Sequence, residues 1–163
     1  MDKRIAIMAV VAVLGAAGCC MGGGSSAAPI SLGPGFAPDP TTATGSAGGI
    51  TQASTLSPDC VGNISLIPNH TVTVTGPIPL LRVIVNSSAD TTLAVRTPNG
   101  QVICNDDSGD PQHSLNPAVD IANAAAGNYE IYVGSYSDAS QLASYRIGFT
   151  ANAQAFGSSI PAP

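Results

Sequence analysis

Residues 80–100 read LLRVIVNSSADTTLAVRTPNG, and this stretch decides the fold class. Every second side chain in its first half is apolar: Leu81, Val83 and Val85. That alternation is typical of a β-strand with one buried face. Leu80 and Ile84 add apolar side chains to the opposite face, which predicts that a second layer covers this strand on its other side.

The same stretch ends in Thr97-Pro98-Asn99-Gly100, which predicts a hairpin turn. Proline sets the backbone angle of the first turn position, and glycine tolerates the left-handed one. Alternating apolar positions recur in the ranges 71–75, 93–95, 102–104, 119–121, 129–133 and 145–149. No stretch keeps helical spacing for three turns. We therefore predict an all-β fold, an antiparallel β-sandwich or jelly roll of seven or eight short strands.

The first 18 residues have the three parts of a secretory signal peptide. Lys3 and Arg4 give a positive start, residues 5–17 are an uninterrupted apolar run, and Ala17-Gly18 precede Cys19. This ending resembles the lipobox of bacterial lipoproteins, in which the cysteine is acylated and becomes the new N-terminus. The alternatives are ordinary cleavage, which releases a soluble secreted protein, and retention of the apolar run as a membrane anchor.

Lipidation of Cys19 makes a membrane the first expected partner of the chain. Each buried acyl methylene contributes about 0.8 kcal/mol, so two or more chains hold a protein at a membrane without a protein segment inside the bilayer. Cys20 follows, and by the same resemblance a residue other than aspartate at this position favours the outer membrane. We expect a membrane-anchored lipoprotein of the cell envelope, at the outer membrane or the periplasmic face, with secretion as the alternative.

Composition divides the rest of the chain. From residue 21 to 56, 28 of 36 residues are Gly, Ala, Ser, Thr or Pro. Such a segment buries too little apolar surface to offset its ordering entropy. We predict that the lipidated cysteine and a flexible linker occupy 19–56, that the folded domain spans 57–152, and that 153–163 form a loose tail.

Cys60 and Cys104 are the two cysteines of the predicted domain. An exported chain folds in an oxidising compartment, so a disulfide between them is expected. It would close a loop of about 45 residues and contribute about 4 kcal/mol in the chain-entropy model. Two buried free thiols are the alternative, and zinc is not expected because the ligand spacing is missing.

The charge balance excludes one class of partner. The chain has a formal charge of −5, and residues 19–163 contain three arginines and no lysine. A nucleic-acid-binding protein needs clustered Lys and Arg to release counterions. No nucleic acid is therefore expected as a partner, whereas an envelope protein or an extracellular polymer is compatible with this charge.

Five pieces follow one another in residues 89–150. They are ADTTLAV at 89–95, PNG at 98–100, CNDD at 104–107, NPAV at 116–119 and AGNYEIYVG at 126–134. Their order and spacing resemble the bacterial pre-peptidase C-terminal domain, a β-sandwich often attached to secreted proteases. The resemblance implies an accessory role in secretion or processing, and some members of the family bind extracellular polymers or calcium. Here a leader and a predicted linker, and not a protease domain, precede the module.

An acidic loop follows Cys104. Its oxygen-bearing side chains are Asn105, Asp106, Asp107 and Asp110, with Asn116 and Asp120 close behind. Adjacent carboxylates repel one another unless a cation neutralises them, and hard oxygen ligands suit Ca²⁺. The spacing is not that of an EF-hand, and a solvated turn bonded to its own backbone is the alternative. Calcium is the one cofactor that the sequence suggests.

Two tyrosines are candidates for a binding surface. Tyr132 alternates with the predicted buried residues Tyr129, Ile131 and Val133, so it belongs on the opposite face of their strand, with Tyr136 beyond it. Exposed tyrosines on a sheet face stack on sugars or partner proteins. A second layer that covers this face is the alternative.

No catalytic constellation is recognisable in the sequence. His70, His113 and Ser114 are residue types that hydrolases use, but neither a G-x-S-x-G elbow nor an H-E-x-x-H motif is present. Asp106 and Asp107 would face opposite ways on a strand, unlike the carboxylates that flank a sugar in glycosidases. We predict a non-catalytic accessory or binding module, with a calcium-dependent adhesive or carbohydrate-binding domain as the alternative.

Overall fold

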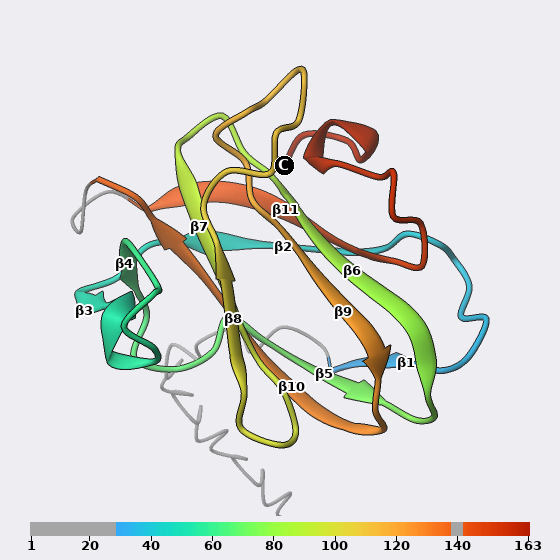
Figure 1. The fold of residues 1–163 in the computed structure, drawn as a ribbon. Helices are drawn as coiled ribbons and strands as arrows, with labels where there is room; N and C mark the ends of the chain where they lie inside the picture. Colours follow the sequence, from blue (N-terminus) through green and yellow to red (C-terminus); the bar gives the residue numbers. More distant parts are fainter. Residues whose placement is uncertain (1–28, 138–141) are drawn as a thin grey trace, which may run out of the picture.

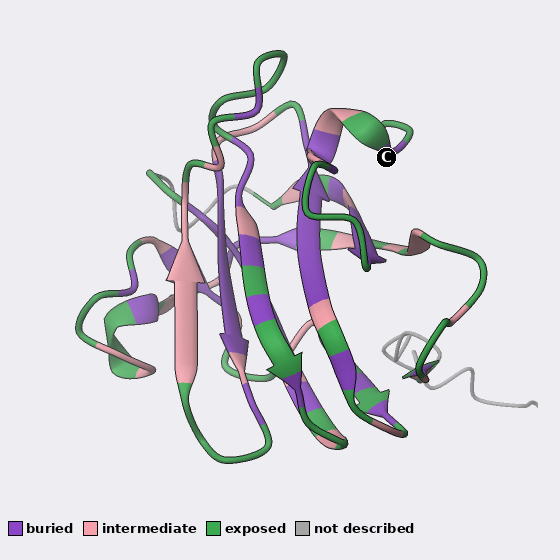
Figure 2. Ribbon diagram, turned by 45° about the vertical axis from the view of Figure 1, so that its right-hand side comes forward, coloured by how far each residue is buried: buried purple, intermediate pink, exposed green. Residues whose placement is uncertain are grey.

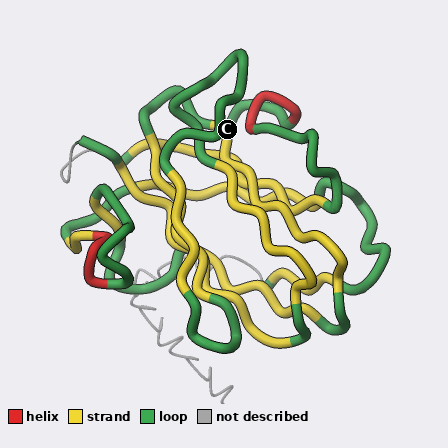
Figure 3. Tube along the Cα trace, viewed as in Figure 1, coloured by secondary structure: helices red, strands yellow, loops and turns green. Residues whose placement is uncertain are grey.

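A computed structural model describes residues 29–137 and 142–163, and this part of the chain is built mainly from β-strands (Figures 1 and 3). Seven strands form the first sheet: β1 (Ile30–Leu32), β3 (Thr51–Gln52), β4 (Asn63–Ile64), β5 (His70–Val74), β7 (Thr91–Arg96), β8 (Val102–Asn105) and β10 (Gly127–Ser135). Four strands form the second: β2 (Thr41–Ala47), β6 (Ile78–Asn86), β9 (Ala118–Ala124) and β11 (Ala143–Thr150). The predicted all-β sandwich is confirmed. The predicted signal peptide and Cys19 lie outside the described residues.

Strand β10 is the centre of the first sheet. It pairs antiparallel with β5 on one side, with β7 on the other, and with β4 at Ser135. Strand β1 pairs parallel with β5, and β8 pairs with β7. The second sheet runs in the order β2, β11, β6, β9, and all its pairs are antiparallel.

The core lies between the two sheets, where the alternating apolar side chains of both meet (Figure 2). Its largest fully buried members are Tyr129, Tyr145, Phe149, Leu32, Leu81, Leu93, Ile131 and Ile147. The alternation predicted for β5, β6, β7, β10 and β11 is therefore confirmed. Burial of these apolar side chains contributes most of the free energy that stabilises the sandwich.

The prediction of a flexible linker is wrong for residues 29–56. Strands β1, β2 and β3 and the 3₁₀-helix η1 (Ala53–Thr55) all fall in this range. Strand β2 pairs along its whole length with β11, from Ala47 opposite Ala143 to Thr41 opposite Phe149. Leu32 of β1 is buried in the core.

Small residues make β2 look like a linker in the sequence, although they suit its place in the sheet. It is an edge strand, so its backbone hydrogen bonds to β11 hold it in place, and only one of its faces meets the core. Gly45 lies opposite Tyr145, and a β-carbon at that position would collide with the tyrosine hydroxyl. A large side chain at Gly45 would exclude the strand from the sheet.

The predicted loose tail is also wrong. The 3₁₀-helix η2 (Gly157–Ser159) lies in this segment, and Ile160 packs against Ile84 on the outer face of β6. Asn86 donates a hydrogen bond from Nδ2 to the carbonyl oxygen of Ile160 at 2.8 Å. The second layer predicted over this strand is therefore the C-terminal segment itself.

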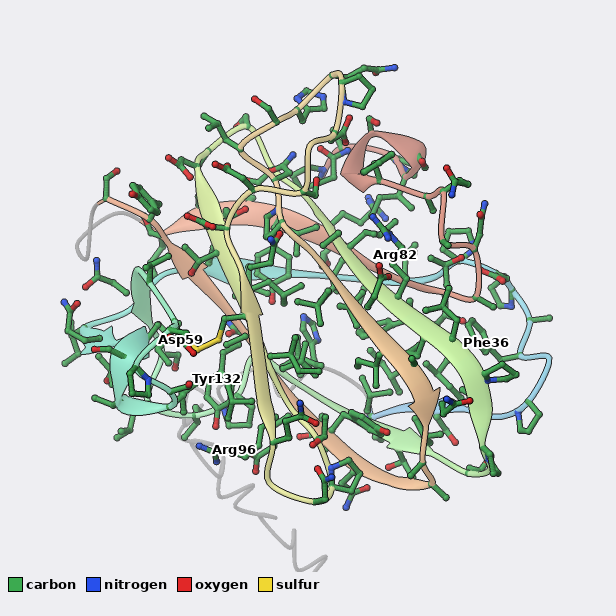
Figure 4. The ribbon with its side chains drawn as sticks, in the orientation of Figure 1. Phe36, Asp59, Arg82, Arg96 and Tyr132 are labelled. Carbon is green, nitrogen blue, oxygen red and sulfur yellow. A yellow bond between two sulfur atoms is a disulfide. The ribbon has the colours of Figure 1, made fainter. Side chains whose placement is uncertain are left out.

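Arg82 ties the same segment to the sheet (Figure 4). Its Nε donates to the carbonyl oxygen of Ala155 at 2.7 Å, and its guanidinium lies 5.2 Å from the ring centre of Phe156. Its Nη1 forms an ion pair with Asp120 at 2.8 Å.

Within the described ranges, no helix has the length and the apolar composition that a membrane span requires.

Candidate functional site

The disulfide predicted between Cys60 and Cys104 is confirmed, with the two Cα atoms 5.4 Å apart. It joins β8 to residues 53–62, which we call the covering segment because they lie over the outer face of the first sheet. Ala53 and Cys60 of this segment form a second apolar cluster with Ile64, Ala94 and Tyr132 of the sheet. The disulfide thus holds a layer outside the main sandwich in place.

The covering segment changes the role of Tyr132. Its side chain was expected on an exposed face, but only 4% of it is accessible, and the prediction of a stacking surface is wrong for this residue. Arg96 lies over the ring at 5.9 Å (Figure 4), and the hydroxyl donates to Glu130 Oε2 at 3.2 Å. Burial, and then the charge of Glu130, raise the pKa of Tyr132. Tyr136 remains 49% exposed.

Asp110 of the acidic loop is buried, and its carboxylate holds the C-terminal segment. It accepts hydrogen bonds from the backbone N–H and the hydroxyl of Ser158, both at 2.8 Å, and from the backbone N–H groups of Gln112 and His113. Burial by itself raises the pKa of Asp110, but these hydrogen bonds outweigh it, and the pKa lies below its ordinary value. Both oxygens of the carboxylate are engaged by the fold.

The other acidic residues of the loop, Asp106 and Asp107, lie near Asp90. Asn105 donates from Nδ2 to the carbonyl oxygen of Asp107 and accepts from the N–H of Ala118, as the turn alternative requires. Burial, and then the charges of Asp107 and Asp106, raise the pKa of Asp90. Among residues 29–137 and 142–163, no group of three or more His, Cys, Asp or Glu side chains is placed to hold a metal ion. Calcium binding in this loop stays a prediction.

Asn116 and Asp120, which follow the loop in sequence, have partners elsewhere. Asn116 is buried and donates from Nδ2 to the carbonyl oxygen of Ser87 at 3.1 Å. Asp120 pairs with Arg82 on the outer face of the second sheet. The structure gives both residues a role in the fold.

His70 is buried in the core beside Tyr145. Its Nε2 lies 2.7 Å from the tyrosine hydroxyl, and its Nδ1 has no hydrogen-bond partner. Burial lowers the pKa of His70, so the neutral form is favoured, and burial raises the pKa of Tyr145. His113 and Ser114 lie far along the chain from this pair, in the loop between β8 and β9, where they line a shallow pocket of about 220 Å³.

A larger cleft opens at one end of the sandwich, with a volume of about 310 Å³. The turn between β7 and β8 supplies Thr97, Pro98, Asn99 and Gln101, and strand β9 with its following turn supplies Ile121 to Ala125, while Tyr129 lies at the base. None of these side chains is charged. The volume falls at the lower end of the range for small-molecule sites, roughly 300–1,000 Å³.

Local hydrogen bonds fix the first wall of the cleft. Thr97 donates from its hydroxyl to Asn99 Oδ1 and to the carbonyl oxygen of Gln101, and the N–H of Gln101 also bonds to Asn99 Oδ1. Asn99 is thereby held by both flanking residues of the turn. The amide of Asn99 is therefore preorganised, which lowers the entropy cost of binding a ligand.

Asn123 lies in the opposite wall. Its backbone φ is 51°, and among the described residues it is the one with a positive φ that is not a glycine. Gly127 allows the two walls to approach each other closely, because a β-carbon at this position would lie only 2.7 Å from the Pro98 ring. The hydroxyl of Tyr129 donates to the carbonyl oxygen of Ala125 at 2.9 Å and holds the second turn.

Sequence reasoning identified the Pro98 turn but not the cleft. A signal was available, because consecutive antiparallel strands place alternate turns at the same end of a sheet.

No protein-family model matches this chain, and no curated protein matches it. The pre-peptidase C-terminal domain of a collagenase from Bacillus anthracis is similar at 14% sequence identity and a TM-score of 0.44, covering 75% of this chain and 94% of that one. PliG of Aeromonas hydrophila, a periplasmic inhibitor of g-type lysozyme, is similar at 15% identity and a TM-score of 0.40, covering 74% and 95%.

Proposed function

We propose that the protein is an exported lipoprotein of the cell envelope whose β-sandwich acts as a non-catalytic binding or accessory module. The disulfide carries this proposal. Cys60 and Cys104 bond the covering segment to β8 and bury the second apolar cluster. A bond of this kind persists in an oxidising compartment, which agrees with the signal-like first 18 residues and the lipobox-like ending at Cys19.

Adjacent cysteines allow a matched test of the anchor. Cells that express the full chain are labelled with radioactive palmitate, as are cells that express Cys19→Ala or Cys20→Ala. The proposal expects label in the wild type and in Cys20→Ala, and none in Cys19→Ala. Equal labelling of both variants, or no label in the wild type, would contradict a lipid anchor at Cys19.

A second candidate function, carbohydrate binding, is favoured by the uncharged cleft. Its walls offer the exposed amides of Asn99, Gln101 and Asn123 beside the exposed ring of Pro98. A neutral sugar needs this mixture, since its hydroxyls form hydrogen bonds and its C–H faces pack on apolar atoms. A charged ligand has no counter-charge in the lining.

The cleft is tested with neutral soluble sugars. NMR titration of the full chain with cello- and chito-oligosaccharides should shift the resonances of Gln101 and Asn123, and Gln101→Ala should weaken the response. Gln154→Ala, an exposed glutamine outside the cleft lining, is the matched control and should leave the response unchanged. Each titration is repeated with EDTA and with added Ca²⁺, and loss in EDTA would support the calcium-dependent alternative.

A further inference from the structure

Three large aliphatic side chains stand exposed beside the covering segment. Ile50 is 91% exposed, Leu66 81% and Ile67 69%, and we call these three residues the apolar rim. Strands β3 and β4 bring their segments together, because Thr51 pairs with Ile64. Ile50 directly precedes Thr51, and Leu66 and Ile67 follow Ile64 by two and three positions. The rim residues thus come from two segments that adjoin β3 and β4, and these two strands lie at one edge of the fold (Figure 1).

The backbone on both sides of the rim is held by the central strand. The N–H of Gly48 donates to the carbonyl oxygen of Val133, and the N–H of Asn69 donates to that of Ile131. Asn69 also donates from Nδ2 to the carbonyl oxygen of Ser46 at 3.0 Å. The rim is thus presented from a fixed frame. A cluster of exposed apolar side chains on such a frame is typical of an interaction surface.

The charge around the rim indicates an apolar target. Residues 49–69 contain a single charged side chain, Asp59, and no basic one. The rim therefore has no group that pairs with an anionic protein, a nucleic acid or an acidic lipid headgroup. Its contribution to binding comes from the burial of aliphatic surface.

The described part of the chain begins beside the strand that follows the rim. Strand β1 pairs parallel with β5, and Ile30 lies beside Val72. Strand β5 begins at His70, three positions after Ile67 of the rim. Cys19 is ten positions before Pro29, so the covalent chain allows the anchor a reach of at most about 36 Å.

We propose that the apolar rim inserts into the interfacial region of the membrane that anchors Cys19. This inference rests on the lipid anchor proposed above, and it adds a second contact between the protein and the bilayer. The acyl chains on Cys19 hold the protein at the bilayer, and insertion of the rim adds buried aliphatic surface to that attachment. The rim would orient the sandwich so that this edge faces the membrane.

Fluorescence tests the insertion directly, because the chain contains no tryptophan. Leu66→Trp is the probe, and Leu115→Trp is the matched control, since Leu115 is 52% exposed and lies in the loop between β8 and β9. Acylated protein is placed in vesicles of phosphatidylethanolamine and phosphatidylglycerol at 3:1. We expect a blue shift and quenching by lipids brominated at carbons 6 and 7 for Leu66→Trp, and neither for Leu115→Trp.

The same probes are also coupled to the vesicles without biological acylation. The chain from residue 19, with Cys20→Ser, is joined through Cys19 to a maleimide phospholipid, which leaves the proposed anchor out of the test. Quenching of Leu66→Trp here supports the rim even if the native protein proves unacylated. An unchanged emission maximum and no quenching in both preparations would overturn the inference.

Removal of the rim provides a second readout. For unanchored protein with Cys19→Ser and Cys20→Ser, the triple change Ile50→Ser, Leu66→Ser and Ile67→Ser should lower partitioning into the same vesicles about tenfold or more, because the lost area is aliphatic. Raising NaCl from 0.1 to 0.5 M should leave the partitioning unchanged. If the triple change instead converts a dimer into a monomer and leaves partitioning unaltered, the rim is a contact between copies and the inference fails.

Discussion

The buried His70 and Tyr145 pair makes the stability of the sandwich depend on pH in a defined direction. Burial lowers the pKa of His70 from 6.5, so the folded chain holds the imidazole neutral, while the unfolded chain takes up a proton near pH 6.5. Stability is therefore complete above this pH and is lost as the pH falls below it toward the folded-state pKa.

The size of the effect follows from the proton that the unfolded chain binds. Between pH 7.5 and pH 5.5, His70 lowers the free energy of unfolding by at most about 1.4 kcal/mol. For a domain of this size, that difference corresponds to a fall in Tm of about 3–6 °C. The change has this sign because His70 is only 4% exposed and its Nδ1 has no partner that would stabilise the charged form.

Urea unfolding of the full chain at the two pH values measures this change. His70→Gln should remove most of the pH-dependent difference, whereas His113→Gln should retain it, since His113 is the other histidine and is exposed. The reasoning is refuted if His70→Gln and wild type lose the same free energy between pH 7.5 and 5.5. It is equally refuted if wild type is more stable at the lower pH.

Three further changes test the corrected fold. Replacing both Cys60 and Cys104 with serine should lower the free energy of unfolding by about 4 kcal/mol, because the bond closes a loop across 44 positions, and urea curves under non-reducing conditions measure this. Gly45→Ala should cost about 1–3 kcal/mol by displacing Tyr145, whereas unchanged stability would show that β2 does not pack as described. Asp110→Asn should cost about 1–3 kcal/mol near pH 7 and nothing below the folded-state pKa, which a pH series of melting curves checks.

The sequence predicted the parts of the fold that large apolar side chains build. Strand β6, with Leu81, Val83 and Val85 on one face and Ile84 on the other, was recognisable because period two and burial on both faces leave a direct mark on composition. The disulfide was predictable from the compartment and the cysteine count.

Strand β2 and the C-terminal segment were missed for a physical reason. Edge strands and covering loops gain much of their stability from backbone pairing and from a few contacts with distant residues. Gly45 suits its place because Tyr145 lies opposite, and Ile160 is held because Asn86 donates a hydrogen bond to its carbonyl oxygen. Neither partner is apparent from the local sequence.

The candidate sites also combine features that the local sequence predicts with features that depend on distant residues. Tyr132 was expected on an outward face from strand alternation, and it does lie there, but residues 53–62 cover it. Only the three-dimensional pairing of β3 with β4 reveals that layer. The cleft between Asn99 and Asn123 depends on two turns that are 24 positions apart in sequence. The structure brings them together because β7 and β10 are neighbours in one sheet.

Intact-mass analysis of the protein extracted from cell membranes tests the central claim most directly. The account predicts a chain that begins at Cys19, carries the added mass of acyl groups, and has lost two hydrogens to the bond between Cys60 and Cys104. A chain recovered wholly in the aqueous fraction, with an unacylated N-terminus, would contradict it.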